Sequence, residues 1–254
     1  MNLDAFNLTG KNALVTGSRT GLGRAMAIGL AEAGANVMVH GSKENGLDEV
    51  CASIRATGVK SARATADLSD QSAPARLMDA MLAEFGSIDI LINNAGIARR
   101  KAAVDYSLDD WNTVIQINLT SVFQMAQFAG REMIKNGRGK IINTASLLSF
   151  QGGILVPAYA AAKGGIATLT MALANEWAPK GVNVNAIAPG YMSTDLTAAL
   201  ENDPARNRAI VDRIPAGRWG SPKDLAGAAV FLASSASDYI HGAVLAIDGG
   251  WLGR

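Results

Sequence analysis

Short runs in which nearly every position is apolar recur along the chain, and they alternate with longer stretches whose apolar residues return every three or four positions. The short runs are bounded by Gly, Asn, Asp or Ser, a pattern typical of buried strands. They predict strands at residues 13–16, 36–39, 61–65, 88–92, 140–144, 183–188 and 244–247. The longer stretches predict helices at residues 22–33, 44–56, 73–84, 108–135, 158–177 and 223–233.

The alternation of these elements indicates the fold class. Strands that are apolar on both faces and separated by helices form parallel sheets, because each crossover needs a helix to return the chain to the same edge. We therefore expect one α/β domain over residues 1–254, a Rossmann-like, doubly wound sheet of seven parallel strands with helices on both faces. Residues 190–220 lack a clear period, and such a long segment in a compact domain is usually functional, so we expect a substrate-binding lid there.

Composition narrows the class of partner. The 254 residues include 23 Lys or Arg and 22 Asp or Glu, a balance that gives no reason to expect nucleic acid or an anionic membrane as partner. The apolar runs are too short to span a bilayer, and the amino terminus lacks the pattern of a signal peptide. The single cysteine, Cys51, and the absence of metal-ligand spacing fit a cytoplasmic protein without a metal that acts on a small molecule.

A glycine-rich turn follows the first predicted strand and leads directly into a helix. Its sequence is TGSRTGLG, residues 16–23. Glycine lets the backbone turn tightly and approach a pyrophosphate, whose charge then lies on the free N–H groups of the helix. A glycine triplet alone also fits an ordinary tight turn. Its position in the first βα turn of a doubly wound sheet favours a dinucleotide site that includes Gly17, Gly21, Leu22 and Gly23.

The end of the second predicted strand bears on the choice between the two nicotinamide cofactors. An acidic residue there would bond the adenosine 2′-hydroxyl and repel a 2′-phosphate. The sequence has His40, Gly41, Ser42 and Lys43 instead, and Arg19 of the glycine turn can reach the same space. These donors suit a phosphate, although a single Lys or Arg is most often a solvated surface charge. The pattern favours NADP, and NAD stays open as the alternative.

Two ionisable residues stand four positions apart in an otherwise apolar helix. Tyr159 and Lys163 of YAAAK share a helical face, so we expect the ammonium beside the phenol, where it would lower the phenol pKa toward neutrality. Ser146 ends the fifth predicted strand, at the sheet edge where ligands bind, and Asn118 is a polar residue that can hold water or kink its helix. Each residue alone has an ordinary interpretation as a packed or capping side chain. Together they favour a catalytic set.

Several motifs together resemble the short-chain dehydrogenase/reductase family over essentially the whole chain: TGSRTGLG, NNAG at residues 93–96, Asn118, Ser146, YAAAK and PGYMST at residues 189–194. The resemblance implies that Tyr159 is the catalytic acid/base and that Lys163 lowers its pKa and binds the nicotinamide ribose. It implies that Ser146 orients the substrate oxygen and that Asn118 holds a water in the proton relay. It also implies a homotetramer, and further cofactor contacts at Asp67, Leu68, Asn94, Ala95, Gly96, Pro189, Gly190, Met192 and Thr194.

Longer stretches, at residues 146–165, 175–195 and 212–227, resemble the branch of that family that acts on 2-dehydro-3-deoxy-D-gluconate, a sugar acid of hexuronate breakdown. The branch implies hydride transfer between a nicotinamide cofactor and a keto or hydroxy group of a small sugar acid. Such a substrate needs a cation for its carboxylate. Of the doublet Arg99 and Arg100, which directly follows the NNAG motif, Arg99 is predicted to meet the carboxylate, and Gln151 is a second predicted substrate contact.

Two other functions stay open. A 3-oxoacyl-carrier-protein reductase would use the same catalytic residues and would need a basic docking patch. Arg131, Lys135 and Arg138 at one helix end are candidates for that patch, or else a cationic terminus favoured by the helix dipole. A non-catalytic NADP(H)-binding sensor or scaffold would keep the fold, but it has no physical need for an ionisable pair in an apolar site.

Overall fold

The computed structural model describes residues 3–195 and 197–254, and in these residues seven strands form one parallel sheet in the order β3-β2-β1-β4-β5-β6-β7. The strands are β1 (Asn12–Val15), β2 (Asn36–Gly41), β3 (Ser61–Thr65), β4 (Ile90–Asn93), β5 (Gly139–Thr144), β6 (Val182–Pro189) and β7 (Val244–Ile247). All positions of β4 and β6 are buried, as expected for strands covered on both faces. The predicted doubly wound sheet is confirmed.

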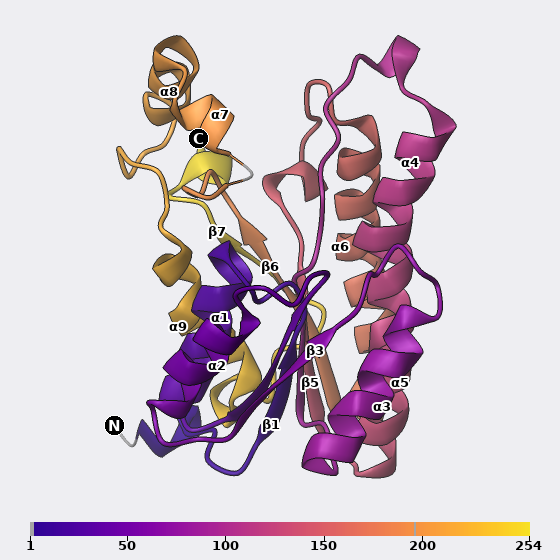
Figure 1. Cartoon of the computed structure of the whole chain (residues 1–254). Helices are drawn as coiled ribbons and strands as arrows, with labels where there is room; N and C mark the ends of the chain where they lie inside the picture. The colour runs from indigo at the N-terminus through magenta and orange to yellow at the C-terminus, as the bar shows by residue number, and fades with distance from the viewer. Residues whose placement is uncertain (1–2, 196) are drawn as a thin grey trace.

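Helices cover both faces of this sheet (Figure 1). One face carries α1 (Gly21–Glu32), α2 (Leu47–Arg55) and α9 (Ala226–Ala233). The other carries α3 (Ala73–Phe85), α4 (Leu108–Ile115), α5 (Ser121–Lys135) and α6 (Pro157–Trp177). Each layer buries its own apolar core against the sheet, which fixes the strand ends from which the site is built. Among the helices described, none has the length and apolar character needed to cross a membrane.

Two predicted stretches differ from the structure in detail. Residues 108–135, expected as one helix, form α4 and α5 with a π-helical turn at Gln116–Thr120 between them. Such turns often occur at functional sites, and Asn118 lies in this one. Within residues 190–220 the chain forms α7 (Ala198–Glu201) and α8 (Pro204–Val211), which are too short to give a visible period.

The carboxyl edge of the sheet gathers the segments singled out in the sequence. From β1 the chain builds β2 and β3 on one side and then crosses over to build β4 on the other side, so a crevice opens at this switch point. The glycine turn follows β1 and the NNAG loop follows β4, while α7, α8 and the carboxyl terminus lie above the end of β6 (Figure 1). Residues far apart in sequence are therefore brought to one edge.

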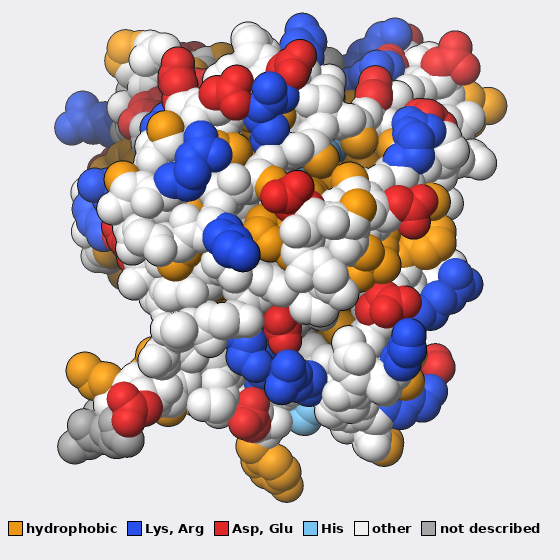
Figure 2. Space-filling model, turned by 60° about the horizontal axis from the view of Figure 1, so that its bottom comes forward, with side chains coloured by type: hydrophobic (Ala, Val, Ile, Leu, Met, Phe, Trp, Pro, Cys, Tyr) orange, Lys and Arg blue, Asp and Glu red, His pale blue; other side chains and the backbone are white. Residues whose placement is uncertain are grey.

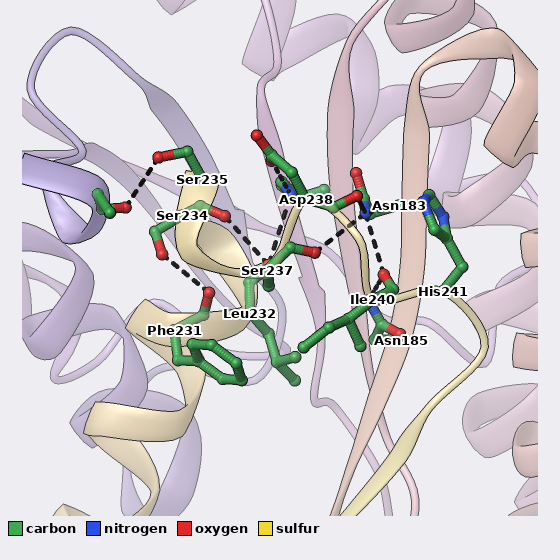
Figure 3. Close-up of polar contacts among 12 residues, drawn as sticks. Asn183, Asn185, Phe231, Leu232, Ser234, Ser235, Ser237, Asp238, Ile240 and His241 are labelled. Carbon is green, nitrogen blue, oxygen red and sulfur yellow. Dashed lines mark hydrogen bonds and ion pairs between the residues drawn. The ribbon is translucent and has the colours of Figure 1, made fainter.

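At the amino edge of the sheet, where the strands begin, polar side chains form a hydrogen-bonded network (Figure 3). The amide Nδ2 of Asn183 donates to the carbonyl oxygens of Asp238 and Ile240, each at 3.0 Å. Asn185 joins the same loop, since its Nδ2 donates to the Ile240 carbonyl at 2.9 Å. Lys140 Nζ lies 2.7 Å from the Asp238 carboxylate. These bonds fasten the connection between α9 and β7 to the start of β5 and β6.

Candidate active site

A cavity of about 350 Å³ opens at the carboxyl edge. Its wall is built from the turn after β5, the start of α6, residues 190–220 and the carboxyl-terminal segment. The polar or aromatic side chains that line it include Arg100, Ser146, Gln151, Tyr159, Thr194, Arg206, Arg213 and Trp251. The structure thus brings together three residues predicted to contact substrate: Ser146, Gln151 and Tyr159.

Tyr159 and Lys163 stand on one face of α6, which begins at Pro157. Lys163 is 4% exposed and its Nζ donates to the carbonyl oxygen of Thr144, the last residue of β5, at 2.5 Å. The same Nζ lies 5.5 Å from the centroid of the Tyr159 ring. The ammonium is therefore beside the phenol ring, as expected, but it is anchored to the sheet.

The pKa values of this pair follow mainly from burial. Burial raises the pKa of Tyr159, while a hydrogen bond with Ser146 and the charge of Arg100 act in the opposite direction. Burial lowers the pKa of Lys163 to about 8. The net direction for the phenol pKa is therefore opposite to the expected one, and the part of Lys163 in lowering it stays a prediction. Its Nζ is directed at a main-chain carbonyl, and desolvation of the phenol outweighs the nearby charges.

Ser146 is held in place relative to α6 by a neighbouring hydroxyl. It follows β5 and caps a 3₁₀ turn, where its Oγ accepts from the Leu148 N–H at 3.2 Å. Ser149 in that turn accepts from the Ser146 N–H at 3.3 Å and donates its own hydroxyl to the Lys163 carbonyl at 2.6 Å. Ser149 therefore links the serine to the helix that carries Tyr159.

Asn118 is fully buried, and its amide pairs with the backbone of Ile97 at both ends. Its Oδ1 accepts from the Ile97 N–H at 2.9 Å, and its Nδ2 donates to the Ile97 carbonyl at 2.8 Å. A Cβ added to Gly96 would lie 3.2 Å from Asn118 Oδ1. The side chain therefore holds the NNAG loop against the π-helical turn, and its role in a proton relay stays a prediction.

The glycine turn has the geometry of a dinucleotide cradle. Gly17 and Gly21 have φ of +63° and +56°, in the left-handed region, and a Cβ on Gly23 would lie 2.3 Å from the Gly17 carbonyl oxygen. Asn94 Nδ2 braces the turn by donating to the carbonyls of Thr16 and Gly17 at 3.0 and 3.1 Å. The N–H groups of the first turn of α1 have no partner within the helix and are available for a pyrophosphate. These residues fit the nucleotide that the sequence predicts.

Basic residues gather at the end of β2, where an adenosine ribose would lie. The stem of Arg19 covers this strand end, since a Cβ added to Gly41 would lie 3.5 Å from Arg19 Cβ. Lys43 is exposed nearby, and neither Arg19 nor Lys43 forms an ion pair within the described ranges. The adjacent carboxylate of Glu44 is paired with Arg63 instead. Positive charge is therefore left over at this position, and Ser42 adds an exposed hydroxyl.

His40 does not belong to that group, which corrects its inclusion among the phosphate donors. It is 2% exposed and turned inward. Its Nδ1 accepts from the Gly17 N–H at 3.1 Å, so its Nε2 carries the hydrogen and donates to the Ala66 carbonyl at 2.9 Å. Burial lowers its pKa, which keeps the ring neutral. His40 thus supports the glycine turn from below.

The structure reverses the predicted roles of the arginine doublet. The Arg99 guanidinium forms an ion pair with Asp110, a contact that lowers the pKa of that carboxyl. Arg100 lines the cavity, and its charge acts on the Tyr159 phenol. The prediction for Arg99 rested on nearness in sequence to the NNAG motif, whereas the chain turns so that the next side chain faces the site.

The other predicted cofactor residues lie along the same edge. Leu22, Pro189, Gly190, Met192 and Thr194 border the cavity. Asp67 and Leu68 follow β3, where the Asp67 carboxylate accepts from the Ser69 N–H at 2.9 Å. Ala95 donates its N–H to the Thr16 hydroxyl at 3.1 Å, behind the glycine turn. Whether each one touches a cofactor stays a prediction.

The cavity residues that were not predicted as site residues include Arg206, Arg213 and Trp251. Arg206 and Arg213 come from residues 190–220, where arginines and acidic residues are equal in number, so the charge of that segment gave no signal. Trp251 was interpreted as packing, and it does pack: its ring lies 4.7 Å from that of Tyr191 and is 4% exposed. It also borders the cavity, which nothing in its local sequence indicated.

A dinucleotide cradle at a sheet switch point, beside a buried Tyr–Lys pair and a strand-end serine, is the arrangement of a nicotinamide-dependent oxidoreductase. A family model described as "Enoyl-(Acyl carrier protein) reductase" matches residues 17–252. The chain belongs to the short-chain dehydrogenase/reductase family and is an NAD(P)-dependent enzyme.

Known relatives and solved structures are similar to this protein over 99–100% of its chain. The 2-dehydro-3-deoxy-D-gluconate 5-dehydrogenase of Dickeya dadantii is 54% identical, with 100% of each chain covered. A structure from Agrobacterium tumefaciens with bound NADP, provisionally named a 2-deoxy-D-gluconate 3-dehydrogenase, has a TM-score of 0.92 at 52% identity and covers 99% of this chain and 100% of its own. A gluconate 5-dehydrogenase from Burkholderia cenocepacia, in complex with NADP and tartrate, has a TM-score of 0.95 at 41% identity and covers 99% of each chain.

Proposed function

We propose that the protein transfers a hydride between NADP(H) and a keto or hydroxy group of a small sugar acid, 2-dehydro-3-deoxy-D-gluconate or a related keto acid from uronates. One observation carries this proposal: a single cavity presents the guanidinium of Arg100 together with Ser146 and Tyr159. A cation for a carboxylate and hydroxyls for a carbonyl can then hold one short molecule at two points. The names of the relatives support the same substrate class.

The chain's own groups supply the proton chemistry. When bound, the nicotinamide donates or accepts the hydride. Ser146 orients the substrate oxygen, and Tyr159 gives a proton to that oxygen during reduction or removes one during oxidation. The positive charge of Arg100 favours the phenolate form and holds the substrate carboxylate. Lys163 holds the nicotinamide ribose, and Asn118 keeps the NNAG loop in position behind it.

We assign the preference for NADP to Arg19, Ser42 and Lys43. Replacing both cations, as Arg19→Ala with Lys43→Ala, removes charge-assisted contacts to a 2′-phosphate, which are worth about 1.5–3 kcal/mol each. The Kd for NADPH, measured by fluorescence titration, should rise at least about tenfold, while that for NADH changes less than about twofold. An equal loss for both cofactors would remove the 2′-phosphate assignment.

We further propose that residues 190–220 form a substrate lid and that the protein is a cytoplasmic homotetramer. The segment contributes Tyr191, Thr194, Arg206 and Arg213 to the cavity wall, which supports a role in enclosing substrate. Exposed apolar residues on neighbouring helices, Phe123 on α5 and Met171 on α6, at 41% and 45% exposed, offer surface for subunit contacts. Light scattering coupled to size exclusion tests the assembly.

The arrangement of charge argues against a carrier-protein reductase. Arg131, Lys135 and Arg138 lie at the end of α5, which leads into the start of β5, and so at the edge opposite the cavity. Arg138 is partly engaged with Asp89 at 3.5 Å. On the face turned forward in Figure 2, basic and acidic side chains are interspersed instead of forming one basic patch.

A screen of nicotinamide absorbance at 340 nm tests the proposed function. Each cofactor is paired with 2-dehydro-3-deoxy-D-gluconate, other keto or hydroxy sugar acids, and an acyl thioester. We expect turnover with sugar acids and NADP(H), and little with the thioester. Preference for the thioester would overturn the substrate class. Cofactor binding without turnover of any substrate would instead indicate a sensor or scaffold.

A further inference from the structure

The carboxyl-terminal turn reaches back across the molecule to the substrate cavity and delivers Trp251 to its wall. The carboxylate of Asp248 fixes this turn by accepting from the N–H groups of Gly250 and Leu252, each at 2.9 Å. Gly250 has φ of +91°, in the left-handed region that only glycine adopts readily. The indole is further held against Tyr191. Its position is therefore set by backbone geometry as well as by packing.

The indole determines how a neighbouring amide faces the site. Trp251 Nε1 donates to Gln151 Oε1 at 3.2 Å. An indole N–H is only a donor, so Gln151 must present its oxygen to Trp251 and cannot exchange its two ends without losing this bond. Within residues 3–195 and 197–254, no hydrogen bond uses the Gln151 Nε2 group. Because Gln151 lines the cavity with Ser146 and Tyr159, its NH₂ is left as a free donor there.

The same indole also holds a cation at the cavity. The guanidinium of Arg213 lies 4.1 Å from the centroid of the Trp251 ring, and Arg213 lines the same cavity. Gln151 through its NH₂ and Arg213 through its guanidinium both offer only donors. A molecule rich in hydroxyl and carboxylate oxygens has the acceptors that such a wall requires.

We propose that Trp251 is a positioning residue for substrate recognition: it orients the Gln151 amide so that the NH₂ group donates to a hydroxyl or carboxylate oxygen of the sugar acid. The inference rests on the proposed function. It adds the residue pair, Trp251 and Gln151, that recognises a hydroxyl or carboxylate oxygen of the substrate. Trp251 acts through Gln151 and takes no part in hydride or proton transfer.

Trp251→Phe tests this most directly, because it keeps a ring beside Tyr191 and Arg213 but removes the N–H. The Gln151 amide is then free to rotate, and one hydrogen bond to substrate is weakened. We expect the KM for 2-dehydro-3-deoxy-D-gluconate to rise about fivefold, with kcat within about twofold and the Kd for NADPH unchanged. Trp111→Phe is the matched control, since it also exchanges an indole for a phenyl ring, but Trp111 lies on α4, is 36% exposed and is not among the residues that line the cavity. That variant should leave KM unchanged.

A double-mutant cycle with Gln151→Met separates orientation from packing. Gln151→Met should raise KM by itself, and Trp251→Phe should add nothing in that background. An equal rise with and without Gln151, or an equal rise in Trp111→Phe, would overturn the inference. If Trp251→Phe fails to fold, Gln151→Glu replaces it: the carboxylate still accepts from the indole but offers no NH₂, so an unchanged KM would overturn the proposal.

Calorimetric titration of the NADP⁺ complex with D-gluconate, in all four variants of the cycle, gives a readout that does not need turnover. Affinity that depends on Trp251 only when Gln151 is present supports the inference, even if no sugar acid is turned over and the proposed function fails. Turnover by the wild type with no coupling between the two residues overturns the inference alone. A wild-type complex that binds no sugar acid overturns both.

Discussion

The two edges of the sheet both collect polar side chains, yet they leave them in different states. At the amino edge, the amide NH₂ groups of Asn183 and Asn185 donate to loop carbonyls, and Lys140 is paired with Asp238. At the carboxyl edge, Arg100 forms no ion pair or hydrogen bond with another described residue, and the Gln151 NH₂ is free. The polar groups of the amino edge are bonded to one another, whereas the carboxyl edge has hydrogen-bond donors without a partner in the described residues.

The difference shows why polarity alone does not mark a site. Buried polar groups in proteins are nearly always satisfied, and a satisfied network contributes stability and a single conformation. Donors that remain unused around a cavity can bind a ligand at little cost, because no internal bond must be broken first. The pattern predicts that substitutions at one edge alter turnover and substitutions at the other alter folding.

The largest effect is expected from the phenol at the carboxyl edge. Tyr159→Phe removes the group that exchanges a proton with the substrate oxygen, so kcat should fall by about a thousandfold or more while NADPH still binds. Stopped assays of sugar-acid reduction and cofactor fluorescence measure the two quantities. Tyr239→Phe is the matched control, since Tyr239 lies near the amino edge and is 100% exposed. Turnover that survived in Tyr159→Phe would refute the acid/base assignment.

A smaller effect on binding is expected from the arginine that faces the cavity. Arg100→Ala removes a charge-assisted contact to the carboxylate, worth about 1.5–3 kcal/mol, so kcat/KM for the sugar acid should fall roughly tenfold to a hundredfold. Arg99→Ala is the internal comparison, because it loses only the exposed pair with Asp110 and should change kcat/KM less than about twofold. If Arg99→Ala had the larger effect, the reversal of roles would be wrong.

At the amino edge the expected effect falls on stability alone. Asn183→Ala leaves several loop carbonyls without their donor, so the free energy of unfolding should drop by about 1–3 kcal/mol. The kcat/KM of the remaining folded enzyme should not change. Urea denaturation and steady-state assays on one preparation give both values, with exposed Asn175→Ala as a neutral reference. A loss of kcat/KM without a loss of stability would erase the distinction between the edges.

The fold followed from the sequence because its signals are local and repeated. Apolar runs such as Ile90–Asn93 occur where strands covered on both faces must lie, and Gly17 and Gly23 occur where no Cβ fits. Ser146, Tyr159 and Lys163 were visible for a similar reason, since strand-end position and helical spacing place them on the same edge.

The substrate wall was much less visible, because its geometry is set by tertiary contacts. Arg99 and Arg100 are adjacent in sequence, and the tertiary structure pairs Arg99 with Asp110 and places Arg100 at the cavity. Trp251 and Gln151 are 100 residues apart, so no local pattern could join them. The direction of the Tyr159 pKa was not visible either: spacing put Lys163 beside the ring, but burial of the phenol, which depends on the tertiary packing, raises its pKa.

The last effect expected concerns the pH dependence of stability, through the buried ammonium, and it leaves the stability at neutral pH unchanged. Burial lowers the pKa of Lys163 from 10.5 to about 8. Below about pH 8 it is protonated in both the folded and the unfolded state, and the full cost of burying the charge is present. Between about pH 8 and 10.5 the unfolded chain binds more protons, so this cost is relieved and stability gains up to about 1.4 kcal/mol per pH unit.

Urea unfolding of the wild type and of Lys163→Met, followed at pH 7.5, 8.5 and 9.5, isolates this effect from other titrating groups. The difference in unfolding free energy between the two proteins should shift in favour of the wild type as pH rises. The gain is confined to the carboxyl edge, because Lys140 at the other edge is held by Asp238 and partly exposed, at 13% for its side chain. A pH-independent difference would mean that burying the Lys163 ammonium has no cost. The difference between the two edges would then concern hydrogen-bond donors only and not buried charge.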